Sequence, residues 1–194
     1  VREIPHVNTI YRHTIYDKEW PSIPHDGRIV VRIGSHADFT DEQTRAIDEF
    51  CATYDAVVCC DHTSGYRGKY EVHAQLVFGQ QMWQSSLRNT NLCIHIGEVS
   101  GDQFCVNAKH TWRVSPDGAL RDTFGNLRRV FMMHEIDFFN HYKKKDCNHT
   151  EYLDSLNKEI DEIKNKIPKH PPKSDDMNIC MKFTVIPGYF ACRI

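Results

Sequence analysis

The chain has 194 residues, of which 40% are hydrophobic and 26% are charged, so it has the composition of a globular protein with a sizeable core. The 24 Lys and Arg residues nearly balance the 26 Asp and Glu residues, and the formal net charge is −2. This balance argues against a nucleic-acid-binding protein and a membrane-surface protein, because both classes carry a basic excess. No stretch approaches the roughly 18 apolar residues that a membrane span requires.

The first third of the chain predicts a lead-in, a strand and a helix. Residues 1–27 contain three prolines and few periodic apolar residues, so we expect an irregular lead-in in which 7–16 is the candidate for an extended segment. The β-branched run at 29–33 predicts a buried strand. Thr40 and Gln43 then form a capping-box pattern that begins a helix. The apolar stripe expected on this helix consists of Ala46, Ile47, Phe50, Cys51 and Tyr54.

The middle of the chain alternates apolar runs with polar turns. We expect strands at 56–60, 91–97, 110–115 and 126–131, and helices over 70–88 and 133–142. The apolar face of the 70–88 helix would carry Val72, Leu76 and Val77. Residues 98–107 have the composition of a loop with a short helix.

Strands that alternate with helices through short connections predict a parallel sheet covered on both faces. The expected fold is therefore α/β, a doubly wound, mainly parallel sheet of five or six strands (Rossmann-like). The carboxyl ends of such strands share one edge, where ligands usually bind. The strand-end residues expected at this edge are Gly34, Ser35, His36, Asp61, Ser64, Gly65, Gly97, Ser100, Gly101 and Asp117.

The C-terminal part predicts a long helix over 148–167. Its narrow apolar stripe predicts docking onto a neighbouring domain or a partner. The stripe consists of Leu153, Leu156, Ile160, Ile163 and Ile167. The expected organisation is an irregular lead-in (1–27), an α/β domain (28–147), this helix (148–167), and a Pro-rich linker with an unassigned tail (168–194).

The eight cysteines lie partly inside apolar runs such as "VVCC" and "NLCIHIG", and no C-x-x-C pair occurs. Cysteines in such runs behave as small buried hydrophobes. We therefore expect a reduced, cytoplasmic protein rather than a disulfide framework.

Three kinds of site are alternatives to simple turns at these strand ends. The glycine turn at Gly34 lacks the G-x-G-x-x-G spacing of a dinucleotide site, and no Lys-Ser/Thr follows Gly101 as in a P-loop, although helix-start amides can still bind a phosphate. A metal site over 59–62 is disfavoured, because neighbouring strand residues point to opposite faces. Catalysis by Ser64 or Ser100 lacks a nucleophile elbow.

The order of the motifs resembles the central domain of thiamine diphosphate-dependent enzymes. One strand ends in "DHTSGYRG", the next in "IHIGEVSG", and "WRVSPDGALRDTFGNLRRVF" then leads into "MHEIDFF". The most similar family is 2-succinyl-5-enolpyruvyl-6-hydroxy-3-cyclohexene-1-carboxylate synthase of menaquinone biosynthesis. The similarity covers about residues 28–142, and it places Asp61, Ser64, Gly97, Ser100 and Asp117 at the family's strand ends.

The resemblance implies a parent enzyme with pyrimidine-binding, central and diphosphate-binding domains. Thiamine diphosphate and Mg would lie between the first and third domains, so the resemblance implies no catalytic residue and no metal ligand in this chain. ADP or FAD binds to some related central domains. The parent reaction would be a carboligation or decarboxylation of a 2-oxo acid, with 2-oxoglutarate and isochorismate as substrates in the menaquinone family. Val1 in place of a starting Met also suggests an excised domain.

Two other functions stay open. The chain could be a stand-alone module that binds a nucleotide (ADP, FAD or NAD) at the strand-end edge. It could also be an interaction domain that docks through the 148–167 helix. A homo-oligomer is left open, and neither nucleic acid nor a membrane is expected as a partner.

Overall fold

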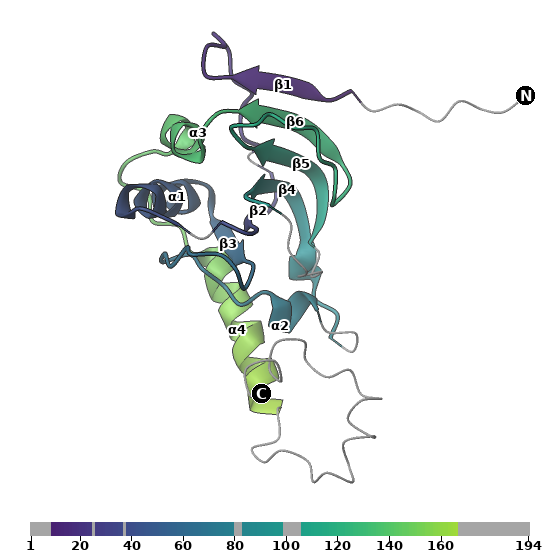
Figure 1. The fold of residues 1–194 in the computed structure, drawn as a ribbon. Helices are drawn as coiled ribbons and strands as arrows, with labels where there is room; N and C mark the ends of the chain where they lie inside the picture. The colour runs from purple at the N-terminus through teal and green to yellow at the C-terminus, as the bar shows by residue number, and fades with distance from the viewer. Residues whose placement is uncertain (1–8, 25, 37, 80–82, 99–105, 167–194) are drawn as a thin grey trace, which may run out of the picture.

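The computed structural model describes residues 9–24, 26–36, 38–79, 83–98 and 106–166 (Figure 1). Its centre is a six-stranded sheet with the order β1-β6-β5-β4-β2-β3, and every adjacent pair is parallel. The strands are β1 (Tyr11–Thr14), β2 (Ile29–Ile33), β3 (Ala56–Cys60), β4 (Asn89–Ile96), β5 (Asn107–Val114) and β6 (Leu127–Met132). The α/β, Rossmann-like fold expected from the sequence is confirmed.

The two strands β2 and β3 are buried along their whole length. They pair in register from Ile29 opposite Ala56 to Ile33 opposite Cys60, and β4 pairs with β2 on its other side. The unbroken apolar run "AVVCC" suits β3 even though it is the edge strand of the sheet, because both faces of a parallel sheet in an α/β fold are covered.

The helix α1 (Asp41–Tyr54) connects β2 to β3, and its start follows the local sequence. The Thr40 hydroxyl accepts from the Gln43 backbone N–H at 3.2 Å, and the Gln43 side chain accepts from the Thr40 N–H at 2.8 Å. The predicted capping box is therefore confirmed. The helix ends at Asp55, which adopts a left-handed conformation with φ 49°.

α1 and α3 (Glu135–Tyr142) cover the same face of the sheet (Figure 1). The ring of Phe50 on α1 lies 5.2 Å from that of Phe139, and Phe138 lies 4.8 Å from Phe131 on β6. The aromatic positions of "DFF" therefore join both helices to the sheet, which stabilises this side of the core.

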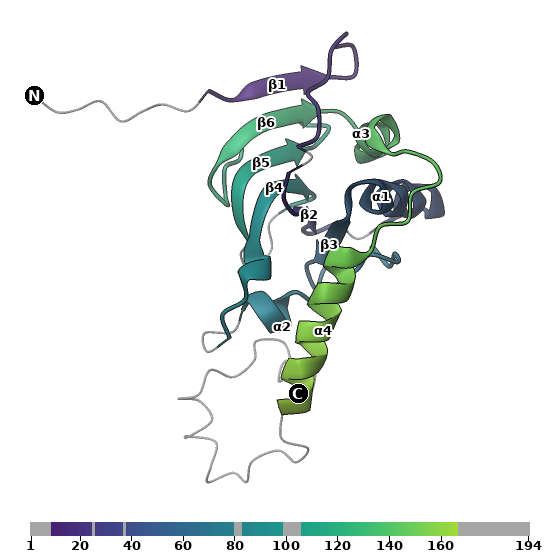
Figure 2. The ribbon, with the colours of Figure 1, turned by 180° about the vertical axis from the view of Figure 1, so that it is seen from behind.

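The helix α4 (Glu151–Lys166) packs beneath β3 and beside the short helix α2 (Gln75–Phe78), as both views show (Figures 1 and 2). The ring of Tyr152 on α4 lies under the Arg28 guanidinium, 5.7 Å away, and its hydroxyl donates to the Leu87 carbonyl. Arg28 immediately precedes β2, and by strand alternation its side chain lies on the same face as positions 30 and 32, opposite α1. The helices therefore cover both faces of the sheet.

The apolar stripe of α4 is buried in the domain's own core. Leu156 is fully buried, and the carboxylate of Asp55 accepts the Tyr152 backbone N–H at the start of the helix. The expectation that this stripe docks onto a neighbouring domain or partner is therefore wrong for its described residues. Ile167 lies outside the described residues.

Two further expectations differ from the structure. The predicted 70–88 helix is wrong for the described residues of this range (70–79 and 83–88), of which only Gln75–Phe78 is α-helical, while Ser86–Arg88 forms a single 3-10 turn. Val72 instead donates its backbone N–H to Val58 on β3, so the segment before α2 runs extended beside the sheet. The lead-in, expected to be irregular, supplies the edge strand β1 within the segment proposed as extended.

The cysteines that the structure describes form no disulfide bond. Cys51, Cys59, Cys60 and Cys93 are buried, and Cys147 is partly exposed. Burial raises the pKa of Cys60 to about 12, so its thiol stays protonated and packs as an apolar group. None of the helices in the described ranges is long and apolar enough to cross a membrane.

Candidate functional site

The sheet has one topological switch point, between β2 and β4. The chain leaves β2 toward β3 on one side and returns to β4 on the other, as in flavodoxin-like sheets. Ligands of open α/β sheets usually enter the crevice between the carboxyl ends of these two strands. The loops after β2 and β4 are therefore the first place to look for a site.

Backbone contacts fill this crevice. The Ser35 N–H donates to the Glu98 carbonyl at 2.6 Å, and the Glu98 N–H donates back to Ser35 at 3.1 Å. A Cβ atom built on Gly34 would clash with the Glu98 carbonyl oxygen, so only glycine allows this approach. Gly97 has a φ of 73°, which turns the chain into the bridge. The Ser35–Glu98 bridge thus occupies the crevice between the ends of β2 and β4.

The loop after β3 is held by its own side chains. The carboxylate of Asp61 is 4% exposed and accepts from both the backbone N–H and the hydroxyl of Thr63, at 2.8 Å each. The hydroxyl of Ser64 accepts the Tyr66 N–H, and the Gly65 N–H donates to the His36 carbonyl. Asp61 and Ser64 thus serve as turn formers.

A buried carboxylate connects the loop after β2 to both helices of one face. Glu135, at the start of α3, is 4% exposed and accepts from the His36 ring at 2.9 Å and from the Gln43 side chain at 2.8 Å. The hydrogen bond to Glu135 raises the pKa of His36 against the opposing effect of burial. The arrangement is an ion pair that fastens three segments together.

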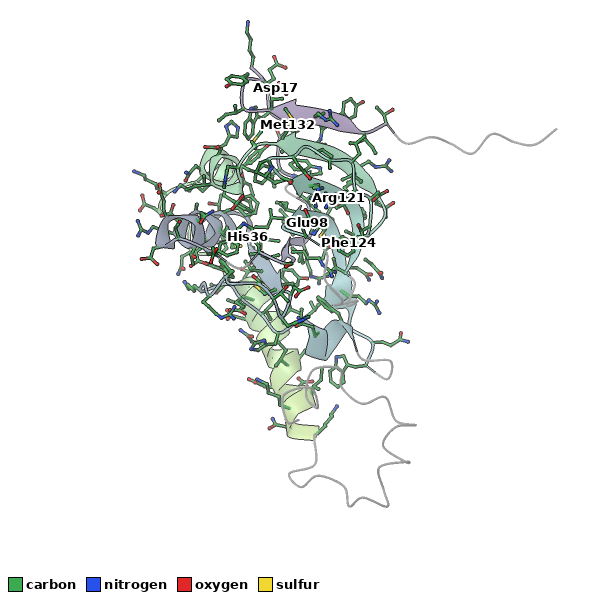
Figure 3. The ribbon with its side chains drawn as sticks, viewed as in Figure 1. Asp17, His36, Glu98, Arg121, Phe124 and Met132 are labelled. Carbon is green, nitrogen blue, oxygen red and sulfur yellow. The ribbon has the colours of Figure 1, made fainter. Side chains whose placement is uncertain are left out.

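Asp117 lies in the turn after β5. Its carboxylate accepts from the Ser115 hydroxyl at 2.7 Å and from the Ala119 N–H at 3.0 Å, and these bonds lower its pKa. It also pairs with Arg121, whose guanidinium contacts the Glu98 carboxylate. Figure 3 shows Arg121, Glu98 and Phe124 close together over the sheet.

The structure therefore brings most of the expected edge residues together, but as loop contacts. Gly34, Ser35 and Gly97 meet at the switch point, and Gly65 joins them through His36. Ser100 and Gly101 lie outside the described residues. No group of three or more His, Cys, Asp or Glu side chains suited to a metal ion occurs among the described residues.

The sequence reasoning missed a row of basic side chains on the sheet itself. Arg32, His95 and Arg113 stand opposite one another on β2, β4 and β5 and are 4%, 2% and 1% exposed. The available signal was a basic residue inside each apolar run, "IVVRI", "LCIHI" and "TWRV". Buried basic groups need partners, so such residues are candidates for function.

No protein-family model matches the chain, and no curated protein matches it.

Proposed function

We propose that this chain is the central, mainly structural domain of a thiamine diphosphate-dependent enzyme that decarboxylates a 2-oxo acid and transfers the acyl group. The parent most similar in motif order would be a 2-succinyl-5-enolpyruvyl-6-hydroxy-3-cyclohexene-1-carboxylate synthase. Thiamine diphosphate and Mg would be held by the parent's pyrimidine- and diphosphate-binding domains. The chain alone would have no catalytic activity.

One observation supports the structural role: the polar groups at the strand-end edge are engaged in holding the loops. The carboxylates of Asp61 and Asp117 already accept two or more hydrogen bonds each, and Ser35 bridges to Glu98. A catalytic or ligand-binding edge would instead present polar groups whose hydrogen-bonding atoms are available to a substrate. An edge whose polar groups are paired with one another suits a domain that stands between two cofactor-binding domains.

The neighbouring genomic sequence tests the parentage. We expect reading frames for a pyrimidine-binding domain with its activating glutamate on one side and for a G-D-G…N diphosphate-binding domain on the other. Flanking frames that encode unrelated proteins would contradict the proposal.

Calorimetry tests the rival nucleotide-binding module. ADP, FAD and NAD, titrated separately into the full chain, should give no saturable heat at micromolar concentration. Micromolar binding of any of them would favour the nucleotide module instead. We also infer a reducing, cytoplasmic compartment, because the described cysteines form no disulfide bond and most of them are buried.

A further inference from the structure

A cavity of about 640 Å³ lies at the amino-terminal ends of β4 and β5. Its volume is within the range of small-molecule sites, roughly 300–1,000 Å³. The described residues that line it include Phe78, Trp83, Ser86, Arg88, Asn89 and Asn107. Both views show α2, which supplies Phe78, close to the start of β4 (Figures 1 and 2). The cavity is thus at the opposite ends of the strands from the switch point, and the proposed scaffold gives it no role.

Arg88 is the one charged side chain among the described residues of this lining. It is partly buried, and within the described part of the chain its guanidinium has neither a hydrogen bond nor an ion pair. Its Nε is enclosed, whereas its two terminal nitrogens are not among the enclosed polar atoms and can donate to a ligand. A guanidinium held partly out of water without a counter-ion is unfavourable. The position therefore points to a negatively charged partner.

A second guanidinium adds positive charge to the same wall of the cavity. Arg28 donates from one terminal nitrogen to the carbonyl of Ser86 at 3.1 Å and to that of Asn89 at 3.5 Å. These acceptors are neutral, so they leave the charge of Arg28 uncompensated. Two cationic side chains therefore flank the segment from Ser86 to Asn89, and their field favours an anion in the cavity.

Two asparagines offer hydrogen bonds at the strand starts. Asn89 and Asn107 stand opposite each other in the register of β4 and β5, and the amide nitrogen of Asn107 donates to the side-chain oxygen of Asn89 at 3.1 Å. This bond uses one side of each amide. The Asn89 amide nitrogen and the Asn107 oxygen have no partner within the described part of the chain. A donor next to an acceptor suits hydroxyl groups, which can both accept and donate.

Trp83 forms a wall of the cavity and is already engaged by α4. The Lys166 ammonium lies 4.4 Å from the centre of its ring, and its Nε1–H donates to the Glu159 carboxylate at 3.1 Å. One face and the polar edge of the indole are therefore occupied, so Trp83 is a poor platform for sandwiching a nucleobase. The lining favours a hydroxylated body over an aromatic base.

We propose that this cavity binds a small anionic ligand with a hydroxylated body, a sugar phosphate or a sugar acid. Its phosphate or carboxylate accepts from the terminal nitrogens of Arg88, and its hydroxyl groups bond to Asn89 and Asn107. Arginine pairs with either anion through charge-assisted hydrogen bonds, which are the strong ones in protein sites. The site does not depend on the proposed parent enzyme.

The test uses the full chain, titrated by calorimetry with glucose-6-phosphate, gluconate, glucose and ADP at constant ionic strength. Saturable 1:1 binding of glucose-6-phosphate or gluconate is expected, and the tighter of the two identifies the preferred anion. Glucose should bind at least about tenfold more weakly, because it lacks the charged group that pairs with Arg88. Failure of both anions to give saturable heat, or saturation by ADP in their place, would overturn the proposal.

Arg88→Gln and the matched control Arg128→Gln locate the site. Arg128 is a partly buried arginine on β6, outside the cavity, and its replacement removes the same charge. Arg88→Gln should weaken binding about tenfold or more, whereas Arg128→Gln should leave the affinity unchanged. Equal affinity of both variants would refute the site.

NMR of the wild-type chain decides if Arg88→Gln does not fold. The indole N–H resonance of Trp83 must shift as the ligand saturates. That of Trp20, which packs against Phe131 and His141, should stay in place. An unmoved Trp83 resonance would contradict binding in this cavity.

Discussion

Replacing Glu135 by Gln should weaken the domain in a pH-dependent way. The Glu135 side chain is 5% exposed and pairs with His36, which is 25% exposed, at 2.9 Å. Glutamine keeps an oxygen that can accept from Gln43, so the change removes mainly the charged bond to His36. Hydrogen bonds to charged groups contribute about 1.5–3 kcal/mol, which is the loss expected while His36 is protonated.

The sign of the pH effect follows from both partners. The hydrogen bond to Glu135 raises the pKa of His36 above its ordinary 6.5, so this stabilisation is complete below 6.5 and is lost as the pH rises through the raised value. Burial acts to raise the pKa of Glu135, but the His36 hydrogen bond, a backbone hydrogen bond and nearby positive charge outweigh it. The net pKa lies below 4.5, so its contribution is lost only as the pH falls through that lowered value. The ion pair is therefore fully formed between 4.5 and 6.5.

Urea unfolding of the wild type and Glu135→Gln at about pH 5.5 and about pH 9 measures this difference. Glu162→Gln, at an exposed position of α4, is the matched control and should change stability little at either pH. The gap between the wild type and Glu135→Gln should be largest at the acidic pH and shrink at the alkaline one. A gap that is the same at both values would refute the reasoning.

Three further substitutions test the fold by the same unfolding measurement. Thr40→Ala removes the capping box of α1 and should cost about 1 kcal/mol, whereas no loss would mean that the cap is dispensable. Leu156→Ala should cost about 2–5 kcal/mol, because the side chain is fully buried in the domain's own core. A loss under 1 kcal/mol there would favour a loosely attached helix. Gly34→Ala places a Cβ against the Glu98 carbonyl and should cost about 1–3 kcal/mol, and an unchanged midpoint would contradict the tight crossing of the two loops.

The sequence predicts which residues lie at the strand-end edge, but it does not predict what those residues contact there. Parallel topology places Gly34, Asp61 and Gly97 at the same ends of their strands, and the sequence predicts this correctly. That Ser35 closes the switch point against Glu98 depends on two loops 63 residues apart meeting through their backbones. No local pattern encodes such a contact.

The sequence alone determined the features whose causes are short-range. The apolar runs at 29–33 and 56–60 specify buried parallel strands, and the Thr40–Gln43 pair specifies the start of α1, because each depends on neighbouring residues. Tertiary structure decided where long-range packing competes with local preference. The segment around Val72 pairs with β3 instead of forming a helix, and the apolar stripe of α4 is buried within the same domain. The row of Arg32, His95 and Arg113 also depends on the tertiary structure, because its members come from strands that are adjacent in the sheet but not in the sequence.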